Sequence, residues 1–250
     1  MSGLAGKLVL VTGAASGFGR GIAEAFLNAD ASVGVLDIDG DAARSTAAAL
    51  GTGAIAAQAD VASRASLAAA IDQVETAAAR TVDVLVNNAG IGLPPTPLED
   101  VDEDDFDRLT AVNMRAIFNA TQIVVPKMKS ATGGCILNIA STAGVSPRPG
   151  LTWYNASKGW VITATRSMAV ELAPHNIRVN AINPVAGETP LLSTFMGGDT
   201  PENRERFLST IPLGRFSTPE DIAAAAVFLC SDAASLITGV ALEVDGGRCV

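Results

Sequence analysis

Two side chains spaced four positions apart could together transfer a proton: the phenol of Tyr154 and the amine of Lys158. They lie at the start of a segment, residues 155–173, whose pattern predicts a helix, and residues four apart share one face of a helix. A cation about 5 Å from a phenol, at an effective dielectric constant of about 20, contributes roughly 3 kcal/mol, or about two pKa units. We therefore expect Lys158 to lower the pKa of Tyr154 toward about 8, a value suited to general acid–base catalysis.

Ser141 is a third candidate for the same chemistry, because its hydroxyl can donate a hydrogen bond to a carbonyl oxygen and orient it toward the phenol. The alternative is a partly buried tyrosine that lies beside a surface lysine without any catalytic role. Tyr154 is the only tyrosine in the chain, so no other phenol could take this role.

A glycine-rich turn, residues 12–19, stands between the apolar run Leu8–Val11 and a helical pattern starting near Arg20. Such a turn lets the backbone approach a diphosphate, with the N–H groups of the helix start directed at the anion. Small-residue turns also join strands to helices for packing reasons alone. The predicted phosphate contacts are Gly13, Ser16, Gly17, Phe18 and Gly19.

Apolar, β-branched runs alternate with helical patterns, which predicts an α/β fold with a parallel sheet covered on both faces. The predicted strands are Leu8–Val11, Ser32–Leu36, Ala54–Ala57, Val82–Val86, Cys135–Ile139, Arg178–Ile182 and Ala241–Val244. Helical patterns lie near 17–29, 41–50, 63–79, 103–130, 155–173 and 219–231.

Polar residues and glycines follow one predicted strand after another, at the edge where parallel sheets bind ligands. In strand order these are Asp37; Asp60 and Val61; Asn87, Ala89 and Gly90; Ser141; and Asn183 with Pro184. One such residue would mean little, because strand-to-helix turns need caps. The occurrence of such residues after one strand after another predicts a ligand-binding site at this edge of the sheet.

Asp37 indicates which dinucleotide the site prefers. A carboxylate at the end of the second strand can accept hydrogen bonds from both adenine-ribose hydroxyls and would repel a 2′-phosphate. Ala15, Ser16 and Ile38 are neutral, so we predict NAD over NADP. The alternative is that Asp37 caps the helix starting near Asp41.

Composition excludes several classes of partner. The net charge of −9 argues against nucleic acid, and no apolar run has membrane length. The lone His175 and three scattered cysteines give no metal-ligand spacing, so no metal is expected. The start of the sequence lacks a secretory pattern, which favours a cytoplasmic protein.

The chain resembles the short-chain dehydrogenase/reductase family over essentially its whole length. The motifs that carry the resemblance are Thr12-Gly-Ala-Ala-Ser-Gly-Phe-Gly19, Asp60-Val61, Asn87-Asn-Ala-Gly90, Asn113, Ser141, Tyr154-Asn-Ala-Ser-Lys158, Asn176-Ile-Arg-Val-Asn180, Thr189-Pro190 and Asp245-Gly-Gly247. It implies a single Rossmann-type three-layer domain over residues 1–250 with a seven-stranded parallel sheet, and a homotetramer formed through the helices near 103–130 and 155–173.

The resemblance also implies a role for each site residue. Tyr154 would be the proton donor and acceptor, and Ser141 would orient the carbonyl. Lys158 would hold the nicotinamide ribose, and Asn113 would position a water linking Lys158 to solvent. Asp60 and Val61 would flank the adenine, with Asn87, Ala89 and Gly90 along the ribose and nicotinamide side. Without the resemblance, Asn113 is a polar residue of a helix interior.

One departure from the family pattern follows the sixth strand, where Pro-Gly is usual. Here Val185 follows Pro184, and glycine is delayed to Gly187, while Thr189 keeps the place of the threonine that contacts the cofactor. Val185 adds β-branched bulk beside the expected nicotinamide position.

Residues 186–215 should form a lid over the substrate, with Leu191 and Leu192 on its apolar stripe and Trp153 adding apolar wall. Core packing is the alternative for the leucines. Arg148 could meet an anionic substrate, although such an arginine is more often a solvated loop residue. Together these residues favour a small or medium, largely uncharged ketone or secondary alcohol.

Three functions remain open at this point. The first is an NAD-dependent dehydrogenase acting on a free alcohol. The second is a 3-oxoacyl-[acyl-carrier-protein] reductase, which the acidic chain disfavours because acyl carriers are acidic themselves. The third is a non-catalytic dinucleotide-binding module, which would have no need of an activated phenol. An epimerase-type relative is disfavoured because the chain lacks length for a sizeable sugar-nucleotide domain.

Overall fold

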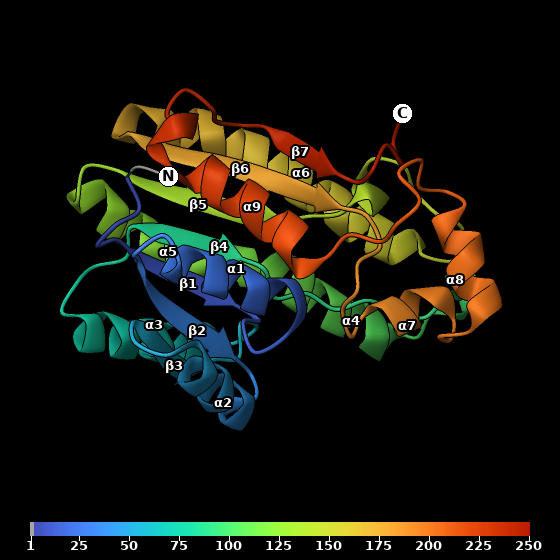
Figure 1. Ribbon diagram of the computed structural model, residues 1–250, viewed down its shortest axis with the longest axis horizontal. Coiled ribbons are helices and arrows are strands. Elements are labelled where there is room, and N and C mark those ends of the chain that lie inside the picture. The colour runs from blue at the N-terminus through green and yellow to red at the C-terminus, as the bar shows by residue number, and fades with distance from the viewer. Residues whose placement is uncertain (1–2) are drawn as a thin grey trace.

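The computed structural model describes residues 3–250, and in this part of the chain seven parallel strands form a single sheet (Figure 1). The strands are β1 (Leu8–Thr12), β2 (Ser32–Asp37), β3 (Ala54–Gln58), β4 (Val84–Asn87), β5 (Gly134–Ile139), β6 (Ile177–Pro184) and β7 (Ala241–Val244). Their order across the sheet is β3-β2-β1-β4-β5-β6-β7. The predicted parallel sheet is confirmed. The strand order reverses between β1 and β4, where ligand crevices open in such folds.

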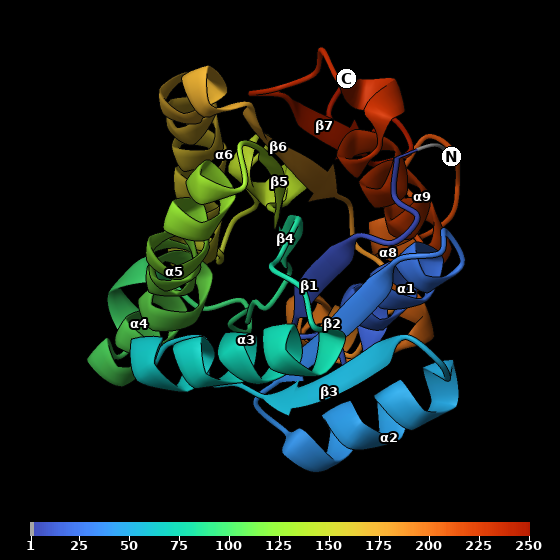
Figure 2. The ribbon, with the colours of Figure 1, turned by 90° about the vertical axis from the view of Figure 1, so that its left-hand side faces the viewer.

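Helices cover both faces of the sheet (Figure 2). On one face the apolar core joins α1 (Gly17–Leu27), α2 (Gly40–Leu50) and α9 (Pro219–Cys230) to the sheet. On the other it joins α3 (Arg64–Ala78), α5 (Ala116–Ser130) and α6 (Thr152–Leu172). Because β1 is buried on both faces, its sequence is a continuous apolar run rather than an alternating one.

The helix predicted over 103–130 is interrupted. The chain forms α4 (Glu103–Thr110), then a π-helical turn over Ala111–Arg115, and then α5. This wider turn lies where Asn113 is buried, and such turns are frequent at functional sites. Periodicity did not reveal the turn, because one wide turn leaves the apolar pattern on either side intact.

The starts of two helices correct details of the sequence-based interpretation. α6 begins at Thr152, so Tyr154 lies inside its first turn rather than before it. The N-cap of α2 is Asp39, whose side chain accepts hydrogen bonds from the N–H groups of Asp41 and Ala42, each at 3.0 Å. The alternative that Asp37 caps this helix is therefore wrong.

Between β6 and α9, the chain forms two short helices, α7 (Leu192–Met196) and α8 (Pro201–Leu208), beyond the carboxyl end of β6 (Figure 1). This is the segment predicted as a lid; residues 186–215 are called the lid below, and their covering of a substrate stays a prediction. It has a small apolar core of its own, made of Val185, Leu192, Met196, Phe207, Ile211 and Phe216. Val185, the residue that departs from the family pattern, therefore packs into this apolar core, and its buried side chain helps to position the segment.

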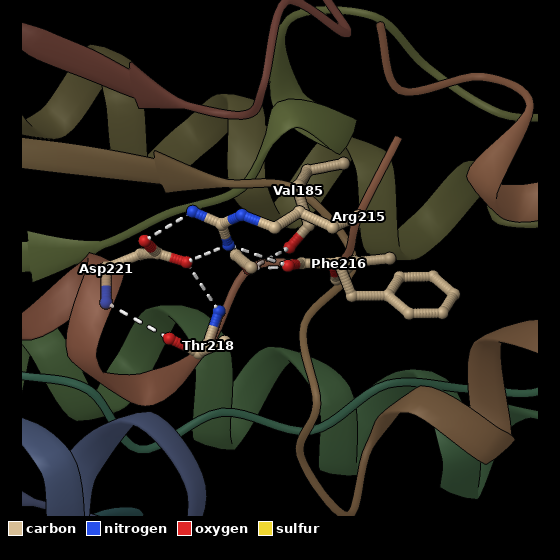
Figure 3. A network of polar contacts seen from close by, with 7 residues as sticks. Val185, Arg215, Phe216, Thr218 and Asp221 are labelled. Carbon is tan, nitrogen blue, oxygen red and sulfur yellow. Dashed lines mark hydrogen bonds and ion pairs between the residues drawn. The ribbon is translucent and has the colours of Figure 1, made fainter. Parts of the chain in front are cut away.

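Polar contacts fix the point where the lid returns to the body of the protein (Figure 3). Arg215 pairs with Asp221 in the first turn of α9 and donates to the carbonyl of Phe216. The Asp221 carboxylate also accepts from the N–H of Thr218, at 2.8 Å, which closes a capping box. The adjacent Ser217 hydroxyl donates to the carbonyl of Val185 at 3.2 Å, so both ends of the lid are tied together.

No helix within residues 3–250 combines the length and the apolar character that a membrane crossing requires.

Candidate active site

A cleft of about 370 Å³ opens at the carboxyl ends of the strands, within the size range of small-molecule sites. Most of the predicted site residues line it. These are Gly13, Ser16, Gly17, Phe18, Asp37, Ile38, Asp60, Val61, Ala89, Gly90, Ser141, Tyr154, Lys158, Pro184, Val185, Gly187, Thr189, Leu191 and Leu192. The fold thus brings residues from six strand ends and the lid to one place.

Four predicted site residues lie outside this lining: Asn87, Trp153, Gly19 and Asn113. The buried Asn87 donates from its side chain to Asn138 at 2.8 Å, inside the sheet. The indole of Trp153 packs edge-on against Phe106, with ring centres 5.4 Å apart, and donates to the carbonyl of Leu98. Adjacent positions in a strand or a helix turn point different ways, and here the neighbours Asn88 and Tyr154 line the cleft. The contact roles of Asn87 and Trp153 stay predictions.

Gly19 and Asn113 also lie behind the cleft wall and support it. A Cβ at Gly19 would stand 2.1 Å from the carbonyl oxygen of Gly13, so this glycine lets α1 pack against the turn. The Asn113 side chain accepts from the N–H of Ile91 at 2.9 Å and donates to its carbonyl at 3.0 Å and to Ser157 at 3.1 Å. Asn113 therefore fixes the loop after β4, and its water-positioning role stays a prediction.

Asn88 and Phe207 line the cleft although sequence reasoning assigned them no role. The Asn88 side chain donates to the carbonyls of Thr12 and Gly13, at 2.9 and 3.0 Å, and so joins β4 to the glycine-rich turn. The Asn-Asn-Ala-Gly motif could have signalled Asn88. Phe207 comes from α8, far along the chain, and no local pattern indicates its contact.

The glycine-rich turn has the geometry that a diphosphate requires. Gly13 and Gly17 have φ angles of 62° and 53°, and a Cβ at Gly13 would lie 2.9 Å from the Cα of Ala89. The N-cap residue Ser16 makes no side-chain capping bond, and the first turn of α1 carries no acidic residue. The N–H groups at this helix start are therefore free to bind an anion, and the helix dipole also favours negative charge there.

Asp37 stands at the next part of the cleft, in a fixed orientation. One carboxylate oxygen accepts from the N–H of Ala15 at 3.1 Å, and the other accepts from the N–H of Asp39 at 3.2 Å. Its neighbour Ile38 is 66% exposed. A carboxylate held in this way can still accept hydrogen bonds from a vicinal diol, because each oxygen has a second lone pair.

Tyr154, Lys158 and Ser141 meet at the other end of the cleft. The Lys158 Nζ lies 5.9 Å from the centre of the Tyr154 ring and donates to the carbonyl of Ile139 at 2.9 Å. The Ser141 hydroxyl oxygen accepts from the N–H of Ala143 at 3.1 Å, which leaves its hydrogen available to donate. The ring of Phe195 from the lid lies 4.8 Å from the Tyr154 ring, measured between centres.

The acidity of this pair differs from the sequence-based expectation. Burial raises the pKa of Tyr154 to about 12, and the nearby Ser141 side chain acts to lower it. Burial also lowers the pKa of Lys158 to about 8. The prediction that Lys158 brings the pKa of Tyr154 toward 8 is therefore wrong for the protein alone. The reason is desolvation, because burial penalises the charged forms of both groups. The sequence-based expectation counted only the attraction between the two charges and left this penalty out.

Within residues 3–250, no cluster of three or more His, Cys, Asp or Glu side chains is placed to hold a metal ion.

Comparison with known proteins gives a consistent result over almost the full chain. Residues 13–248 match a family model described as enoyl-(acyl carrier protein) reductase. The chain is 45% identical over 246 residues to a 4-formylbenzenesulfonate dehydrogenase from Comamonas testosteroni, which covers 97% of each chain.

Two solved structures share the fold closely. The crystal structure of a 3-ketoacyl-(acyl-carrier-protein) reductase from Brucella melitensis, complexed with NADH, has a TM-score of 0.94 and 47% identity, covering 99% of this chain and 100% of that one. A 7α-hydroxysteroid dehydrogenase complexed with NADH and 7-oxo glycochenodeoxycholic acid has a TM-score of 0.91 and 40% identity, covering 98% and 94%. The sheet, the cleft and these similarities together establish that the chain belongs to the short-chain dehydrogenase/reductase family of oxidoreductases.

Proposed function

We propose that the protein is an NAD(H)-dependent oxidoreductase that interconverts a secondary alcohol and a ketone on a small or medium free substrate. Its similarity to dehydrogenases and reductases of the family supports an oxidoreductase that acts on CH–OH groups. The observation that carries the proposal is the convergence of Tyr154, Ser141 and Lys158 at one end of a cleft whose other end is the open glycine-rich turn.

In the proposed mechanism the bound nicotinamide ring supplies the hydride or accepts it. The Ser141 hydroxyl donates a hydrogen bond to the substrate oxygen and holds it near the Tyr154 phenol. Tyr154 gives its proton to that oxygen during ketone reduction. A pKa of about 12 makes the phenol a weaker acid than usual, and the transfer is favourable because the alkoxide that develops is a stronger base. During alcohol oxidation Tyr154 must take the proton back, and the buried Lys158 ammonium then stabilises the phenolate.

Substitution of Tyr154 tests this mechanism. In Tyr154→Phe we expect kcat to fall by about 10²–10⁴-fold, because only the proton-transfer group is removed and the ring is kept. NADH binding, followed by the change in its fluorescence, should persist. Unchanged turnover of an accepted substrate would contradict the catalytic assignment and would favour a non-catalytic dinucleotide-binding module.

The proposed preference for NAD over NADP rests on Asp37. Its carboxylate is fixed by two backbone N–H groups and lines the cleft, so a 2′-phosphate would meet a negative charge that does not move away. The double variant Asp37→Ala, Ile38→Arg should shift the ratio of kcat/KM toward NADP. The matched control is Asp39→Ala, which removes the neighbouring carboxylate that caps α2 and lies outside the lining. An unmoved cofactor ratio in the double variant would contradict the assignment.

The alternative function, reduction of a 3-oxoacyl-[acyl-carrier-protein], is favoured by the 47% identity to a solved reductase of that kind. The net charge of −9 opposes it, because an acidic carrier protein would be repelled. Comparing kcat/KM for an acetoacetyl thioester of acyl carrier protein with that for free ketones decides between the two. A preference of tenfold or more for the carrier-bound substrate would favour the alternative.

A cytoplasmic homotetramer completes the proposal. Apolar side chains on the outer sides of two helices support the oligomer: Phe118 of α5 is 53% exposed and Val170 of α6 is 80% exposed. In the proposed tetramer these two side chains lie in surfaces that another chain covers. The mass in solution, measured by light scattering, tests the tetramer, and a monomer at micromolar concentration would contradict it.

A further inference from the structure

We propose that Arg148 anchors an anionic group, a carboxylate or a sulfonate, on the substrate; the inference rests on the proposed function of the same cleft. Arg148 lies in the loop between β5 and α6 and lines the cleft together with Tyr154. Its guanidinium stacks on Phe207 of the lid, with the Cζ atom 4.3 Å from the ring centre. Stacking holds the plane of the guanidinium and leaves its N–H edges free to bind an anion in bidentate geometry.

The Arg148 guanidinium has no anionic partner in the protein. Within residues 3–250 its N–H groups make no hydrogen bond or ion pair with a side chain or carbonyl, although other arginines, such as Arg204 and Arg215, pair with aspartates. The Arg148 carbonyl accepts from the side chain of Asn155 at 2.8 Å, which ties this loop to the first turn of α6, the turn that also carries Tyr154. A half-buried charge of this kind is costly unless it is compensated, and a ligand anion would compensate it.

A second arginine raises the positive potential at this end of the cleft. Arg248, near the C-terminus, donates to the Ser146 hydroxyl at 3.3 Å, and its buried Nε has no partner in the protein. Burial and the charge of Arg248 together lower the pKa of Arg148. The carboxylate of Asp245 is occupied by two backbone N–H groups of the residues that follow it, at 2.9 and 2.8 Å. Two guanidinium groups thus stand close to each other near this end of the cleft, in a chain whose net charge is −9.

The cleft wall near the phenol and the anchor is apolar. Leu151, Phe195 and Phe207 line it, and Phe195 packs on the Tyr154 ring. The inferred substrate therefore has a carbonyl or secondary alcohol at one end, an apolar and preferably flat middle, and an anion at the other end. This replaces the sequence-based expectation of a largely uncharged substrate, which treated Arg148 as a solvated loop residue.

The test compares probes that share one aromatic ketone and differ chiefly in the charge of the group opposite the carbonyl. With NADH, kcat/KM is measured for 4-acetylbenzoate, its methyl ester and 4-acetylbenzenesulfonate. The wild-type protein should prefer both anions to the ester. In Arg148→Gln the acid-to-ester ratio should fall roughly 10- to 100-fold, the usual effect of losing hydrogen bonds to a charged group. Arg148→Lys should give an intermediate ratio, because it keeps the charge without the planar fork.

The matched control is Arg206→Gln, which removes an exposed arginine of α8 beside Phe207 and should leave the acid-to-ester ratio unchanged. Turnover of the ester with an acid-to-ester ratio that Arg148→Gln does not move would overturn the anchor and leave the proposed oxidoreductase intact. A wild-type protein that binds NADH yet reduces none of the three ketones would overturn the proposed function for this class of substrate, and the anchor with it.

Discussion

Replacing Lys158 by methionine should make the stability of the protein respond differently to pH. Methionine keeps the length of the side chain and removes the ammonium, which is buried and whose pKa burial lowers to about 8. In the unfolded chain the same amine titrates near its ordinary value of 10.5. Between these two values the unfolded chain binds more protons than the folded protein, so the wild-type protein gains stability as the pH rises. The variant lacks this gain.

The magnitude follows from the two pKa values. Between pH 7 and pH 9, Lys158 should add about 1.3 kcal/mol to the free energy of unfolding, out of about 3.4 kcal/mol over its whole titration range. For a domain of this size that corresponds to a shift of roughly 3–5 °C in the melting temperature. The hydrogen bond from Lys158 to the carbonyl of Ile139 is also lost in the variant. That cost is present at both pH values and cancels in the comparison.

The assay is urea unfolding of the wild-type protein and of Lys158→Met, without nucleotide, at pH 7 and pH 9. The quantity of interest is the wild-type value minus the variant value at each pH, because all other titrating groups are common to both proteins. Measurements stay below pH 10, since the raised pKa of Tyr154 makes the folded protein lose stability between about 10 and 12. A difference that stays constant from pH 7 to pH 9 would refute the argument that burial lowers the pKa of this lysine.

Three further predictions concern the neighbourhood of the site. In Gly92→Ala the new Cβ would lie 2.3 Å from the Phe195 ring, so this ring must move away from Tyr154. We expect kcat/KM for an aromatic ketone to fall roughly two- to tenfold. An unchanged value would contradict the role of Phe195 in packing against Tyr154. Gly159→Ala, in α6 with its nearest other atom at 3.8 Å, should instead raise the free energy of unfolding by about 0.5–1 kcal/mol in urea titrations. Burial raises the pKa of Cys249 to about 11, so at pH 8 this half-exposed thiol should react with an aromatic disulfide reagent roughly tenfold more slowly than a free thiol; rapid labelling would count against that value.

Much of the fold could be predicted because it is written in local patterns. The runs that form β1 and β5 are mostly apolar and buried along almost their whole length, and the segments between strands have helical periodicity. Polar residues at successive strand ends therefore predicted one site at one edge of the sheet. The π-helical turn at Ala111–Arg115 escaped prediction because an extra residue in one turn leaves the flanking periodicity unchanged.

Sequence alone determined the parallel α/β architecture, the glycine-rich turn and the identity of the groups that can do chemistry, since each of these depends on residue type and short-range spacing. Only the tertiary structure decided how those groups behave. It buried Tyr154 and Lys158 together, which raises the pKa of Tyr154, although spacing alone suggested a lowered value, and lowers the pKa of Lys158. It also placed Phe207 under Arg148, 59 positions earlier in the chain, and turned Trp153 away from the cleft. Solvation and contacts between distant segments depend on how the whole chain packs, and no local pattern encodes them.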